Sequence, residues 1–77
     1  MTEFENLKRS YASVLQYGMI MGANKSEAKQ GNEIVHKFCE TLVENSMYSD
    51  NDKNYMKNEL QLLKQKIDAE IEAAYSK

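Results

Sequence analysis

The middle of the chain carries the residue pair whose spacing best fits a metal site. Glu33 and His36 have the Glu-x-x-His spacing of di-iron helical bundles, in which both side chains project into the core. One motif supplies too few ligands, and a helical projection places both residues on the polar half of their helix, facing water. Two copies of the chain would be needed to complete such a site. An oligomeric helical metal-binding protein that uses Glu33 and His36 is therefore kept as an alternative function.

A second pair, His36 and Cys39, has the spacing for a nucleophile with its base or for a two-ligand metal clip. Catalysis would need a reactive thiolate beside a cation, together with donors for an oxyanion. Cys39 instead projects onto the apolar face beside Val35 and Leu42, where a buried cysteine behaves as a small hydrophobe. The sequence also lacks a glycine-rich phosphate loop and a His-x-x-x-His motif. We therefore predict a protein that is not an enzyme and that binds no cofactor or metal.

A third cluster has the residue types of a DNA-reading helix. A recognition helix exposes basic and amide side chains near its N-terminus, and the best such cluster here is Lys25, Ser26, Lys29, Gln30 and Asn32. Against this interpretation stand Glu27 and Glu33 on the same helix, the single arginine and the formal net charge of −2. A helix-turn-helix-like nucleic-acid-binding protein is thus an alternative rather than the prediction.

The composition restricts the elements that could position these residues. The 77 residues include no proline, three glycines and one cysteine. So few turn-forming residues argue against a β-sandwich or barrel, and one cysteine can form neither an internal disulfide nor a Cys₄ zinc site. We predict a single all-α domain over residues 1–77 that is held together by helix packing.

Three start signals divide the chain into helices over about residues 3–21, 25–45 and 50–75. Thr2 and Glu5 have capping-box spacing, as do Asn24 and Glu27, while Ser49 precedes two acidic residues. The short connections favour antiparallel neighbours, hence an up-down-up three-helix bundle that homo-oligomerisation could complete.

Each predicted helix has an apolar face that we assign to the core. In the first helix this face comprises Phe4, Leu7, Tyr11, Val14, Leu15, Gly18 and Met21. In the second helix it covers about half the circumference, with Ala28, Gly31, Ile34, Val35, Phe38, Cys39, Leu42 and Val43. In the third helix it comprises Met56, Leu60, Leu63, Ile67, Ile71 and Ala74, at an average step of 3.6 residues.

Four large side chains fall outside these three faces. Tyr17 and Ile20 project away from the core side of the first helix, and Tyr55 and Leu62 form a second strip on the third. Apolar residues in such positions need another chain to bury them. We predict that Tyr17, Ile20, Tyr55 and Leu62 form a protein interface.

The predicted function is a small helical protein–protein interaction module. We expect it to act as a regulator, inhibitor or chaperone of a larger partner protein and to self-associate as a homo-oligomer. The most apolar stretch, from Tyr11 to Ala23, has 13 residues and is too short to span a bilayer. The N-terminus has acidic residues where a signal peptide would be basic. We therefore expect no membrane partner and a cytoplasmic location.

Overall fold

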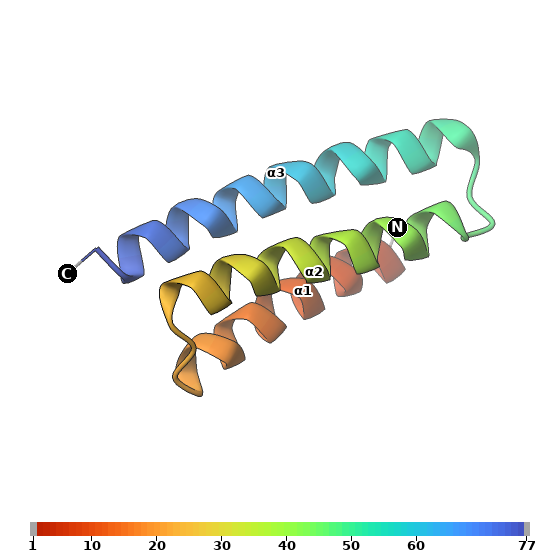
Figure 1. Ribbon diagram of the computed structural model, residues 1–77. Coiled ribbons are helices and arrows are strands. Elements are labelled where there is room, and N and C mark those ends of the chain that lie inside the picture. The colour runs from red at the N-terminus through yellow and green to blue at the C-terminus, as the bar shows by residue number, and fades with distance from the viewer. Residues whose placement is uncertain (1, 77) are drawn as a thin grey trace.

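The chain forms three helices that run up, down and up along one long axis (Figure 1). The computed structural model describes residues 2–76, with α1 at Thr2–Ile20, α2 at Lys25–Glu44 and α3 at Asp50–Ala74. The bundle measures 43 × 18 × 18 Å, and α2 lies between the other two helices and packs against both. The predicted all-α class is confirmed, and each helix begins and ends within a residue of the expected bounds.

Local signals in the sequence account for both connections. Gly22 has φ +102°, and the N–H groups of Gly22 and Ala23 donate to the carbonyls of Met19 and Gly18, which is the Schellman termination of a helix. Asn24 then forms the predicted capping box with Glu27. Ser49 caps α3 by accepting from the Asp52 N–H. Thr2 lies inside α1, and the position before it is outside the described residues.

The core runs along the axis where the three helices meet. Its buried apolar side chains are Phe4, Tyr11, Leu15, Ala28, Cys39, Val43, Met56, Leu60, Ile67 and Ile71. The stripe predicted for α3 supplies four of them, while Leu63 is half-buried and Ala74 is exposed. The interior therefore depends most heavily on α3, whose stripe faces both neighbours.

A hydrogen-bonded asparagine lies at the centre of this core. Asn32 has no exposed surface. Its side chain accepts from the Tyr11 hydroxyl on α1, and its Nδ2 donates to the Lys64 carbonyl (3.1 Å) and to Asp68 Oδ1 (2.8 Å) on α3. Because buried polar groups cost free energy unless they are paired, these bonds fix how α2 is rotated between its neighbours.

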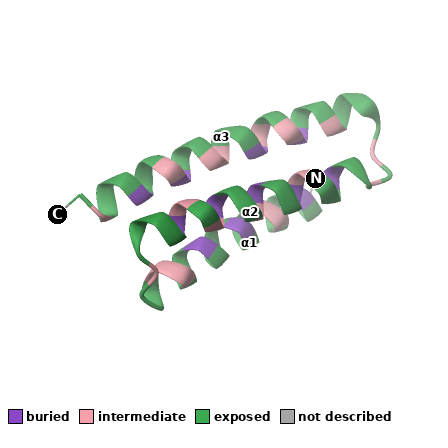
Figure 2. Ribbon diagram, in the orientation of Figure 1, coloured by how far each residue is buried: buried purple, intermediate pink, exposed green. Residues whose placement is uncertain are grey.

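That rotation corrects two predictions for α2. His36, expected to face water, is only 5 % exposed, because it lies one turn after Asn32 on the same buried stripe. Ile34, Phe38 and Leu42, expected in the core, are 68 %, 61 % and 44 % exposed. Figure 2 shows α2 with buried and exposed residues alternating along its visible side.

On α1, Val14 and Met21 differ from the prediction in the same way. They were assigned to the core face and are 55 % and 85 % exposed. The buried stripe of α1 is narrow, with Phe4, Tyr11 and Leu15 on it. Leu7 and Met19 are half-buried against the core.

Candidate interaction surfaces

The four residues predicted as an interface are all exposed, but the structure places them in different surroundings. Tyr17 and Ile20 are 68 % and 69 % exposed on α1, and at 100° per residue they project about 60° apart. On α3, the ring of Tyr55 packs edge-on against buried Phe4, with ring centroids 6.4 Å apart. Leu62 is 59 % exposed. The four therefore form two separate groups, one on α1 and one on α3.

Charged side chains surround Leu62. It lines a shallow depression together with Lys8, Glu59, Leu63 and Lys66, and Lys8 Nζ lies 3.4 Å from the Glu59 carboxylate. An apolar partner packed on Leu62 would have to desolvate these charges, which costs free energy. The outer side of α3 is thus a mixed surface.

The largest apolar surface instead spans α1 and α2. We call it the α1–α2 face and define it by six exposed residues: Val14, Tyr17, Met21, Ile34, Phe38 and Leu42. Sequence reasoning placed only Tyr17 outside the core. The apolar arc of α2 covers half the circumference of the helix and is wider than the stripe of about 100° that core packing requires. This excess width indicates that part of the arc lies outside the core.

Contacts between α1 and α2 place the six residues on one side of the helix pair. Gly31 faces α1, since a Cβ built there would lie 3.5 Å from Leu15 Cδ1. Phe38 is two turns further along α2 and projects within about 20° of Gly31, with Ile34 and Leu42 one turn away on either side. On α1, Leu7 shares a pocket with Leu42, and Val14 follows Leu7 after two turns in nearly the same direction. Val14, Ile34 and Phe38 therefore lie on the same side of the helix pair.

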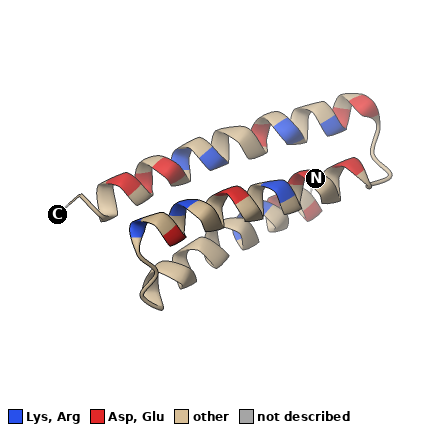
Figure 3. Ribbon diagram, viewed as in Figure 1, with Lys and Arg blue, Asp and Glu red and all other residues tan. Residues whose placement is uncertain are grey.

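Charge is absent from the α1 half of this face. Residues 10–24 contain no Asp, Glu, Lys or Arg, and Figure 3 shows the second half of α1 without a charged residue. Several ion pairs instead join α2 to α3. Lys25 and Lys29 each lie 2.7 Å from Glu72, and their hydrogen bonds lower the pKa of Glu72 to about 2. The electrostatic contacts and the apolar face thus lie on opposite flanks of α2.

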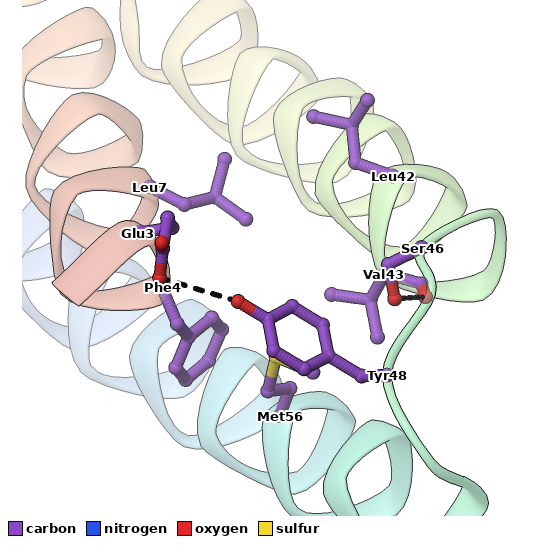
Figure 4. A pocket seen from close by; sticks show the side chains of 8 residues that line it. All are labelled: Glu3, Phe4, Leu7, Leu42, Val43, Ser46, Tyr48 and Met56. Carbon is purple, nitrogen blue, oxygen red and sulfur yellow. Dashed lines mark hydrogen bonds between the residues drawn. The ribbon is translucent and has the colours of Figure 1, made fainter. Parts of the chain in front are cut away.

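A small pocket lies at the end of the α1–α2 face where Leu7 and Leu42 meet (Figure 4). It has a volume of about 90 Å³, and its lining residues are Glu3, Phe4, Leu7, Leu42, Val43, Ser46, Tyr48 and Met56. The Tyr48 hydroxyl donates to Glu3 Oε2 (3.2 Å) across the pocket. Partial burial and the nearby Glu3 carboxylate raise the pKa of Tyr48, so this hydroxyl stays protonated at neutral pH. The pocket is an apolar recess that a hydrogen bond spans.

A longer groove separates α1 from α3. It has a volume of about 480 Å³ and is lined by Ala12, Leu15, Gln16, Met19, Leu63, Lys66, Ile67, Glu70, Ile71 and Ala74. Leu15, Ile67 and Ile71 at its floor are already buried, and Gln16, Lys66 and Glu70 are exposed polar residues. The groove therefore offers less exposed apolar surface than the α1–α2 face.

The surroundings of Cys39 oppose nucleophilic chemistry. The thiol is free and only 2 % exposed, and burial raises its pKa. A catalytic cysteine requires the opposite shift, toward the thiolate. Cys39 acts as a core residue, as its apolar projection predicted.

Glu33 and His36 do not converge as metal ligands would. Glu33 is exposed, and Lys64 Nζ lies 2.9 Å from its carboxylate, which lowers the pKa of Glu33. His36 is buried, with Nε2 3.3 Å from Glu40 and Nδ1 without a hydrogen-bond partner. Among residues 2–76, no group of three or more His, Cys, Asp or Glu side chains is placed to hold a metal ion.

The function has to be argued from the α1–α2 face, because comparisons with known proteins found no match. No family of proteins, no curated protein and no solved structure matches the chain. Within residues 2–76, none of the three helices combines the length and the apolar character that crossing a bilayer would require.

Proposed function

We propose that this chain is a small protein–protein interaction module that binds protein through the α1–α2 face. The observation that carries the proposal is the size of that face. Because an aromatic side chain presents roughly 150–250 Å² and an aliphatic one less, exposed fractions of 44–85 % over six residues correspond to roughly 600 Å² of apolar surface. The largest apolar patch on a typical monomer is about 300–600 Å² and is often functional.

The chemistry of the face favours protein over other ligands. Nucleic acid is bound through unpaired basic residues that replace counterions on phosphates, and the face contributes no such residue. The basic cluster at the start of α2 is already engaged, since Lys25 and Lys29 both contact Glu72. Tyr17, Met21 and Phe38 belong to the residue types that are enriched in protein interfaces.

The small size of the domain supports a role in a complex. A 77-residue domain without disulfides or metal has a limited core, and here six large apolar side chains lie outside it. Burial of those side chains against another protein would stabilise the folded chain by linkage. We propose that the module regulates, inhibits or escorts a larger protein, and the buried free thiol of Cys39 fits a reducing, cytoplasmic setting.

Site-specific photo-cross-linking in the native host tests this function without assuming the partner. A photoreactive side chain replaces Phe38 in one variant and Gln65, an exposed polar residue of α3, in the matched control. We expect a discrete cross-linked protein adduct from position 38 and none from position 65, read by gel mobility and mass spectrometry. An equal or absent yield at the two positions would show that the face contacts no protein.

A further inference from the structure

We infer that the protein which covers the α1–α2 face is a second copy of this chain, so that the working unit is a symmetric dimer. This inference rests on the proposed function, because it names the partner of the same face. In this dimer, α1 and α2 of each copy form the contact layers, and α3 of each copy lies on the outside.

The first support is the match in area. Each copy offers roughly 600 Å² of apolar surface, so a face-to-face pair buries roughly 1,200 Å², at the lower end of the range of about 1,200–2,000 Å² for stable interfaces. The face of one copy is therefore covered by an equal face of another, with no large apolar remainder. A much larger partner surface would bury charged residues that border the face, such as Lys37, which is exposed on α2.

The second support is electrostatic. In a two-fold symmetric contact the same surface meets itself, so charges on the surface meet like charges. The six residues of the face are uncharged, and residues 10–24 carry no charge at all. The net charge of −2 therefore comes from residues outside this part of the surface. Two copies can approach without like-charge repulsion across the apolar contact.

The third support is the position of the residues along the helices. Gly31 lies beside Leu15, and Leu42 shares a pocket with Leu7. Because α1 and α2 are antiparallel, Val14 and Ile34 then lie near the middle of the face. Phe38 and Leu42 lie toward one end, and Tyr17 and Met21 toward the other. A two-fold axis that crosses the helices at this level brings Ile34 near Ile34 and Val14 near Val14 of the second copy.

The dimer also explains why α3 differs from the other two helices. Its outer side keeps Tyr55 and Leu62 accessible among charged residues. That mixed surface stays free in the dimer.

Sedimentation velocity of the purified chain and two matched variants tests the inference. Phe38→Asp and Leu62→Asp introduce the same charge at side chains that are 61 % and 59 % exposed. At ~100 µM, well within the range in which micromolar contacts are populated, we expect wild type and Leu62→Asp to sediment at twice the 8.9 kDa chain mass. We expect Phe38→Asp to sediment as a monomer with unchanged helicity in circular dichroism.

Cysteine cross-linking locates the axis even if Phe38→Asp fails to fold. Ile34→Cys should give a cross-linked dimer with a short bismaleimide, whereas Leu62→Cys and the parent chain with buried Cys39 should not. A monomeric wild type, or stronger cross-linking of Leu62→Cys, overturns the second copy as occupant. A monomeric wild type that still forms an adduct with another protein from position 38 in the host would leave the proposed function standing and remove only the dimer.

Discussion

The inner side of α2 buries two polar residues beside its apolar ones, and the outer side exposes large apolar residues beside its polar ones. The inner side buries Asn32 and His36, whereas the outer side exposes Ile34 and Phe38. If apolar area alone set the rotation of α2, the helix would be turned to bury Ile34 and Phe38. The hydrogen bonds of Asn32 oppose such a turn and favour the observed rotation, which leaves apolar surface on the outer side.

The magnitudes explain how this arrangement persists. Burying a large apolar side chain stabilises a fold by about 1.5–3 kcal/mol, so leaving Ile34 and Phe38 largely exposed gives up several kcal/mol. Turning α2 the other way would strand the buried Tyr11 hydroxyl, with a penalty of about 1–3 kcal/mol, and would break the bonds of Asn32 to the Lys64 carbonyl and to Asp68. The two terms are similar in size, so burial of the outer side in the proposed dimer would tip the balance toward the observed rotation.

Removing the amide of Asn32 should give the largest effect among the substitutions on α2. Asn32→Ala should lower the free energy of unfolding by about 2–3 kcal/mol, because the side-chain bonds to Tyr11, the Lys64 carbonyl and Asp68 are lost and the Tyr11 hydroxyl keeps only the Asn32 backbone carbonyl (3.1 Å). Urea denaturation followed by circular dichroism measures the change. Gln30→Ala removes an exposed amide from the same helix and should stay within about 0.5 kcal/mol of wild type. Equal effects of the two substitutions would contradict a special role for Asn32.

Replacing His36, which lies on the same inner side of α2, should change the free energy of unfolding by an intermediate amount and in the opposite direction. Its Nδ1 is buried without a hydrogen-bond partner, which is an unfavourable state for a polar atom. His36→Leu should therefore raise the free energy of unfolding by about 1 kcal/mol. This figure already includes the loss of the weak contact between His36 and Glu40. Thermal and urea unfolding both report it. A clear destabilisation would mean that His36 makes a contact that matters more than its orphaned nitrogen.

The sequence predicted the positions of the three helices more completely than it predicted which side chains face the core. Capping residues such as Asn24, Ser49 and Gly22 act locally, and the structure uses all three as expected. The stripe of α3 was also predictable, because apolar residues at 3.6-residue spacing there have no polar competitor. The fold class follows from these local signals.

The rotation of α2 was not predictable by the same reasoning. Hydropathy ranks Asn32 and His36 as surface residues, and only the tertiary contacts with Tyr11, Lys64 and Asp68 make burial of Asn32 favourable. Those contacts join residues 21 to 36 positions apart, which no local pattern encodes. Most of the α1–α2 face was therefore assigned to the core, and Tyr17 alone was placed outside.

The smallest expected effect on the isolated chain belongs to the outer side. Ile34 is 68 % exposed, so Ile34→Gln should change the free energy of unfolding of the dilute, monomeric chain by less than about 0.5 kcal/mol. The same substitution at fully buried Ile71 should cost about 3 kcal/mol or more. If the outer side of α2 mediates association, the unfolding midpoint of wild type should rise with protein concentration, because association stabilises the folded chain. The midpoint of Ile34→Gln should rise less. A midpoint that is independent of concentration in both proteins would show that the outer side of α2 is simply solvated.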